Sequence, residues 1–160
     1  MFKEGSYVVY KQNVCKIKEI KHSALSDKDY YVLVPVSDES LIIDLPVDNN
    51  NLRNLITREE LDNFIKTIKD IKTINVSNDK MLEQEYKLLL KDGTHESLIK
   101  IIKTTYLRNK DRVENKRKIG QKDEEYFKKA ERLLYTEFMI ILNKSYDETK
   151  KYVENIVSNL

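Results

Sequence analysis

The chain has 160 residues, a formal net charge of +2, and 40% hydrophobic and 35% charged residues. This length suits one domain or two small ones, and the composition is sufficient for a packed core under a well-solvated surface. The single cysteine, Cys15, excludes an intramolecular disulfide and fits a reducing compartment. The N-terminus lacks the apolar core of a signal peptide, and no stretch approaches the roughly 20 apolar residues that cross a bilayer. We therefore expect a cytoplasmic protein.

The first half of the chain is predicted to form strands. β-branched and aromatic residues gather in segments that polar turns separate, namely residues 7–10, 14–20, 30–36, 41–47 and, as a short last strand, 52–55. Four or five short strands within about 55 residues predict a small antiparallel β-barrel of SH3 or Tudor type. Barrels of this size more often bind proteins than perform chemistry.

The apolar period changes after Ile56. Thr57-Arg58-Glu59-Glu60 is a capping box, and the apolar residues behind it have helical spacing, so a helix is expected over 57–72. Residues 73–78 are the best linker candidate, and everything beyond them has helical periodicity. The expected fold class is α+β, with a barrel and its connecting helix in residues 1–72 and an all-α helical domain in residues 73–160.

Charge is concentrated in one segment of the helical half. Residues 100–118 contain eight basic side chains and only two acidic ones, Asp111 and Glu114. Such a segment favours nucleic-acid phosphates or an acidic partner. The alternative is a lysine-rich helix face that is simply solvated.

No constellation of residues points to catalysis. The three glycines lie far apart, so there is no phosphate-binding loop. His22 and His95 have no partner at metal-ligand spacing, and Cys15 lies in a predicted strand where a structural role is expected. We therefore expect no enzymatic activity, no cofactor, no metal site and no small-molecule substrate.

Several blocks of the sequence resemble the CarD family of bacterial transcription regulators. In the first half these are Phe2-x-x-Gly5-Ser6-x-Val8-Val9-Tyr10, Tyr30-Tyr31-Val32-Leu33 and Leu45-Pro46-Val47-Asp48-Asn49. In the second half they are Lys91-Asp92-Gly93 and Ala130-x-x-Leu133-Leu134-x-x-Glu137. The resemblance is convincing up to about residue 60 and looser beyond it.

This resemblance implies a function in transcription initiation. The family's Tudor-like barrel is similar to the polymerase-binding module of the transcription-repair coupling factor and docks on the β subunit of RNA polymerase. Its helical domain contacts promoter DNA and steadies the open complex. The positions that match the family's polymerase contacts are Ser23, Ala24, Leu25, Ile42, Ile43 and Asp44. Position and charge give the candidate DNA contacts as Lys80, Met81, Arg108, Lys110, Arg112, Lys116, Arg117, Lys118 and Lys122.

One departure from the family leaves alternatives open. Family members commonly place a tryptophan at the start of the first C-terminal helix, where it wedges into the minor groove, but this chain has no tryptophan. The matching window here is Asn78-Asp79-Lys80, followed by Met81, so weak phosphate contacts are expected to dominate. The runner-up hypothesis is a polymerase-binding adaptor whose helical domain has lost DNA contact and recruits or blocks another protein. A third is a small enzyme with a helical lid.

Overall fold

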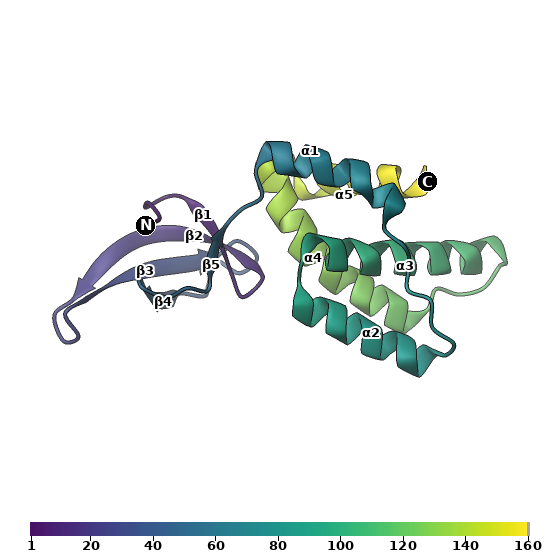
Figure 1. Cartoon of the computed structure of the whole chain (residues 1–160), viewed down its shortest axis with the longest axis horizontal. Coiled ribbons are helices and arrows are strands. Elements are labelled where there is room, and N and C mark those ends of the chain that lie inside the picture. Colours follow the sequence, from purple (N-terminus) through teal and green to yellow (C-terminus); the bar gives the residue numbers. More distant parts are fainter. Residues whose placement is uncertain (160) are drawn as a thin grey trace. The chain divides into compact units, whose positions relative to one another are not determined.

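The computed structural model describes residues 1–159, and the chain divides into two compact units. The β unit is Met1–Ile56 and the helical unit is Thr57–Leu160. The predicted class, a small antiparallel β domain followed by an all-α domain, is confirmed (Figure 1). The connecting helix, which the sequence led us to group with the barrel, belongs to the helical unit. The division of function between residues 1–72 and 73–160 stays a prediction.

The β unit is one five-stranded antiparallel sheet with strand order β4-β3-β2-β1-β5. Its strands are β1 (Tyr7–Tyr10), β2 (Asn13–Ser23), β3 (Lys28–Pro35), β4 (Ile43–Pro46) and β5 (Leu52–Asn54). Alternate residues point to one face and form a core of Val8, Cys15, Ile17, Tyr31, Leu33 and Leu45. The strands at the two edges of the sheet are β4 and β5, and both are short.

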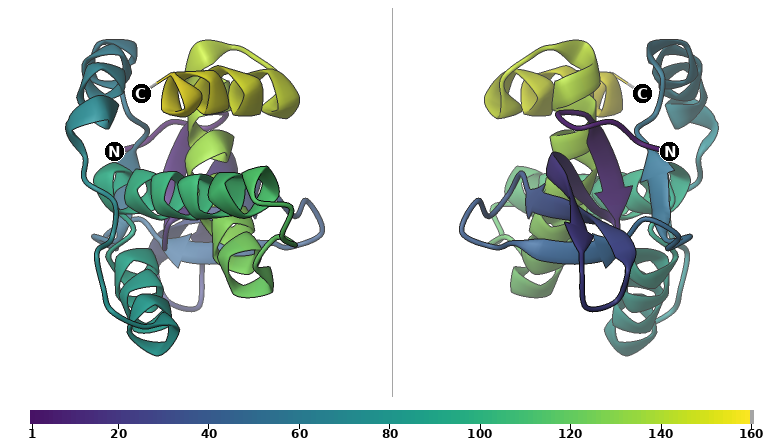
Figure 2. Two further views of the ribbon diagram at one scale, coloured as in Figure 1. Left: turned by 90° about the vertical axis from the view of Figure 1, so that its right-hand side faces the viewer. Right: turned by 90° about the vertical axis from the view of Figure 1, so that its left-hand side faces the viewer.

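The helical unit contains α1 (Arg58–Thr67), the 3-10 turn η1 (Ile68–Asp70), α2 (Asp79–Asp92), α3 (His95–Glu114), α4 (Gln121–Leu142) and α5 (Tyr146–Ser158). Helices α1, α2, α3 and α5 begin with side-chain caps, including complete capping boxes at Thr57 and Ser145, which satisfy otherwise unpaired amides, whereas α4, which Gly120 precedes, begins without one. Helices α3 and α4 pack on each other, and α2 and α5 lie on opposite sides of this pair (Figure 2). None of the helices among residues 1–159 is long and apolar enough to span a membrane.

A buried lysine of α3 donates hydrogen bonds to the backbone of the segment between α1 and α2. Lys103 is 7% exposed, and its Nζ donates to the carbonyl oxygens of Ile68, Lys69 and Ile71. The backbone N–H of Ile74 donates to Thr104 Oγ1 at 3.0 Å. The first part of the predicted linker therefore runs against α3.

Candidate functional site

The β4 edge of the sheet has the properties of a docking surface. Ile43 and Leu45 face the core, whereas Asp44 points outward and forms an ion pair with Lys21 Nζ at 2.8 Å. The hydrogen bond from Lys21 to Asp44 raises the pKa of the Lys21 ammonium, despite some opposition from desolvation. Leu41 and Ile42, just before the strand, are 52% and 62% exposed. An edge strand beside two exposed aliphatic side chains suits addition of a strand from a partner protein.

The second group of predicted polymerase contacts lies at the tip of the β2–β3 hairpin. Ser23 ends β2, the side chain of Leu25 in the turn is fully exposed, and its neighbour Ala24 is also exposed. The turn is braced by His22 Nδ1, which lies 2.8 Å from Asp29 Oδ1.

The structure does not bring these two groups together. Ile43 pairs with Leu33 in the β3–β4 ladder, whereas the hairpin tip begins beyond Lys28 at the other end of β3. At about 3.4 Å per residue, the two groups are separated by roughly 17 Å along the strand. The predicted contacts therefore form two patches on the β unit.

The start of α2 is the window that matches the family's wedging tryptophan, and it holds the candidate DNA contacts Lys80 and Met81. Asn78 caps the helix by accepting a hydrogen bond from the Met81 N–H at 2.9 Å, and Lys80 is exposed. Asp79 forms an ion pair with Arg108 at 3.3 Å. The Met81 side chain is 45% exposed, so it is neither a core residue nor a fully projecting one.

Two of the predicted DNA-contacting arginines, Arg108 and Arg112, donate hydrogen bonds to a buried carboxylate. Asp123 is 3% exposed and accepts hydrogen bonds from Tyr86 Oη at 2.7 Å, Arg108 Nε at 2.9 Å and Arg112 Nη1 at 2.6 Å. Burial by itself would raise the pKa of Asp123, but these three donors outweigh it and hold the pKa below its usual value. We call Tyr86, Arg108, Arg112 and Asp123 the Asp123 network.

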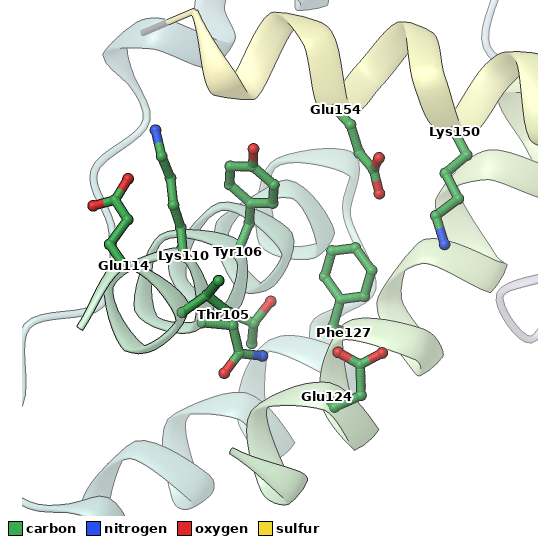
Figure 3. Close-up of a pocket in the computed structure, with 10 residues that line it drawn as sticks. Thr105, Tyr106, Lys110, Glu114, Glu124, Phe127, Lys150 and Glu154 are labelled. Carbon is green, nitrogen blue, oxygen red and sulfur yellow. The ribbon is translucent and has the colours of Figure 1, made fainter. Parts of the chain in front are cut away.

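The remaining predicted cations on the helices point in different directions. Lys110 lies on the opposite side of α3 from Arg108 and Arg112, at the wall of an open hollow of about 500 Å³ between α3, α4 and α5 (Figure 3). Glu114 follows it on the same helix face, so this wall carries both charges. Lys122 pairs with Glu83 at 3.4 Å on the other side of α4. The basic segment is therefore not a single patch.

Three consecutive exposed cations lie between α3 and α4. We call residues 115–120 the basic turn. Lys116, Arg117 and Lys118 are all exposed, and none of them forms an ion pair with another residue of the described chain. The exposed aliphatic residues Val113 and Ile119 flank them. This turn presents three adjacent positive charges to solvent, which is an arrangement that binds phosphates.

Comparison with known proteins bears on the β unit. Residues 2–58 match the family model described as the CarD-like/TRCF RID domain, where TRCF is the transcription-repair coupling factor and RID its RNA polymerase-interacting domain. A search of curated proteins found no match. The match covers all five strands and the first residue of α1. The N-terminal unit of this chain is therefore a CarD-like RNA polymerase-interacting domain.

Proposed function

We propose that this protein regulates transcription initiation by docking on the RNA polymerase β subunit through its β unit and contacting promoter DNA through its helical unit. The observation that carries the proposal is the polymerase-interacting domain over residues 2–58, which gives the chain a polymerase-binding, transcription-related role. This domain type is a non-enzymatic interaction module, and we infer that the whole chain acts as an adaptor.

The β4 edge is the better of the two candidate patches for polymerase. Its open backbone groups can add a strand of the partner, and the exposed Leu41 and Ile42 supply apolar contacts beside it. Asp44 would by itself repel an acidic partner, but Lys21 at 2.8 Å balances its charge. The charge of Asp44 is therefore offset at the edge where the partner would approach.

The basic turn is the better candidate for DNA contact. Side chains that neutralise phosphates bind without reading bases, and the affinity that three charges supply is low at physiological salt. A low affinity is sufficient for a factor that polymerase already holds close to the promoter, because tethering raises its effective concentration. The contact would then affect the lifetime of the open complex more than promoter choice.

The full-length protein provides the decisive experiment. Its affinity for purified RNA polymerase and for the isolated β lobe should be measured first, followed by the lifetime of promoter open complexes with and without it. Binding to the β lobe together with a changed lifetime supports the proposal. Binding to polymerase but not to the β lobe would reject the β subunit as the docking site.

A second candidate function is favoured by the Asp123 network. Because Arg108 and Arg112 bond to Asp123, and Arg108 also pairs with Asp79, much of the basic character of α3 is neutralised internally. This favours an adaptor whose helical unit recruits or blocks another protein. Replacing Lys116, Arg117 and Lys118 together by alanine discriminates between the two functions. An unchanged open-complex lifetime in that variant would favour the adaptor.

A further inference from the structure

We propose that Arg112 is a positioning residue that holds the basic turn in its DNA-binding shape, and that it is not itself a phosphate ligand. This inference rests on the proposed DNA contact of the turn. It reassigns a residue that charge and position alone placed among the DNA contacts.

The hydrogen bonds around Arg112 connect the two ends of the basic turn. Arg112 Nη1 donates to Asn109 Oδ1 at 2.5 Å and to Asp123 Oδ2 at 2.6 Å, so this nitrogen is occupied on both sides. Asn109 Oδ1 also accepts from the backbone N–H of Gly120 at 3.0 Å. Asn109 and Arg112 lie before the turn, while Gly120 and Asp123 lie at and after its end. The guanidinium therefore ties the exit of α3 to the entrance of α4.

Gly120 shows how closely the guanidinium covers the end of the turn. A Cβ atom at this position would lie 2.3 Å from Arg112 Nη1 and 2.6 Å from Cζ. The φ angle of Gly120 is −70°, which any residue adopts, so the backbone conformation does not require glycine here. Glycine is required here only because Arg112 lies so close to it, and Arg112 cannot move aside without breaking its hydrogen bonds.

The other end of the turn is fixed by backbone bonds. The Arg117 N–H donates to the carbonyl oxygen of Arg112 at 2.7 Å, and the Lys116 N–H donates to that of Val113 at 3.0 Å. Lys116 has a φ of 59°, in the left-handed region that non-glycine residues seldom occupy. A turn held at both ends presents its three cations in one arrangement, and a preorganised site loses less conformational entropy on binding.

Substitution of Arg112 by lysine separates positioning from charge. A lysine keeps the positive charge, but its Nζ ends one bond short of the position of Nη1, which bonds to both Asn109 and Asp123, and it lacks the flat guanidinium that covers Gly120. For the full-length protein, binding to a short fluorescent DNA duplex should be measured by anisotropy over a range of salt concentrations. We expect R112K to lose affinity several-fold, about as much as R112M, with the salt dependence of the wild type. The control R132K changes an exposed arginine of α4 in the same way and should have no effect.

The variant K116A/R117A/K118A gives the complementary result. It should reduce the slope of log K against log salt concentration by about 0.9 for each phosphate that the turn no longer neutralises. Wild-type affinity in R112K would overturn the inference while leaving the DNA contact of the turn intact. If the triple variant binds as the wild type does, the proposed DNA contact itself fails, and the role of Arg112 fails with it.

Two measurements test the positioning without DNA. Amide hydrogen exchange at Gly120 should be faster in R112K than in R132K, because Asn109 loses the partner that orients it. Gly120→Ala should destabilise the wild type and do so far less in the R112K background, where the guanidinium no longer blocks the Cβ. Equal effects of Gly120→Ala in both backgrounds, or unchanged Gly120 exchange in R112K, would contradict the inference.

Discussion

The Nζ of Lys103 lies 2.7 Å from the carbonyl oxygen of Ile71, and all of its hydrogen-bond partners in the described chain are backbone carbonyls. The carbonyls of Ile68 and Lys69 complete the set, at the point where α1 and η1 end. A cation at a helix C-terminus is favoured by the partial negative charge of the unpaired carbonyls. The buried ammonium therefore pairs the carbonyl groups at the end of α1 and η1, and so connects this end to α3.

Replacing Lys103 by methionine is expected to destabilise the helical unit by about 3 kcal/mol, because it leaves three carbonyl groups without their donor, two of them in buried hydrogen bonds. Urea denaturation of the full-length protein, followed by circular dichroism, measures this loss. Lys100→Met on the same helix is the matched control, and we expect it to cost less than about 0.5 kcal/mol. Similar losses in the two variants would show that the carbonyl contacts of Lys103 contribute little.

Replacing Ile42 by glutamate is expected to weaken binding to RNA polymerase about tenfold. The added charge would be desolvated at the β4 edge, and the partner would no longer meet an apolar side chain there. Surface plasmon resonance with immobilised polymerase measures the change. Leu88→Glu, at an exposed position in α2, is the control for the added charge and should bind normally.

A parallel Leu25→Glu variant decides between the two patches. A loss of affinity in that variant alone would assign the docking to the hairpin tip and contradict our preference for β4. Loss in both variants would mean that the partner spans the length of β3.

Replacing Glu131 by glutamine is expected to stabilise the protein by about 1 kcal/mol at neutral pH. Burial raises the pKa of Glu131, and its Oε2 accepts no hydrogen bond, although Lys150 lies 3.6 Å away. A folded-state pKa above the unfolded value makes ionisation costly to the fold. The advantage of glutamine should therefore be full above the raised pKa and vanish as the pH falls towards about 4.3, the ordinary value for glutamate. Thermal denaturation across this pH range checks the sign, and an advantage that grows in acid would contradict it.

Elements that depend on local sequence could be predicted, whereas those that depend on register could not. The capping box at Thr57 was visible from the glutamate three residues on, and the structure contains it. In β2 the apolar residues do not follow a strict two-residue alternation, because the register shifts between Ile17 and Glu19. That bulge lets both Ile17 and Ile20 face the core, and a strict two-residue period cannot anticipate it.

In the candidate site, too, the sequence could predict local features but not contacts between distant residues. Net charge singled out residues 100–118 as the candidate segment, but it could not distinguish cations that face solvent from those that bond to a buried carboxylate. Asp123 lies after the basic turn, and in the sequence it has the position of an ordinary acidic residue at the start of a helix. The available signal was the spacing of Arg108 and Arg112, which places both on one face of α3. Their partner is fixed only once α4 folds back on α3.

Replacing Asp123 by asparagine is expected to destabilise the helical unit by about 3 kcal/mol at neutral pH, because it removes the charge that compensates two partly buried guanidinium groups. The pKa of Asp123 is held below its usual value, so its stabilising contribution is complete above the unfolded-state value of about 3.9 and is lost as the pH falls through the folded-state pKa. The difference between wild type and variant should therefore be largest near neutrality and shrink in acid. Urea denaturation at several pH values measures it.

The sign of this pH dependence is opposite to that expected for Glu131, where the wild type is the less stable protein at neutral pH. Asp111→Asn, at an exposed position on α3, serves as the control for loss of a carboxylate and should change stability little at any pH. A loss in the Asp123 variant that stays constant into acid would mean that the shape of the carboxylate, and not its charge, holds α2, α3 and α4 together.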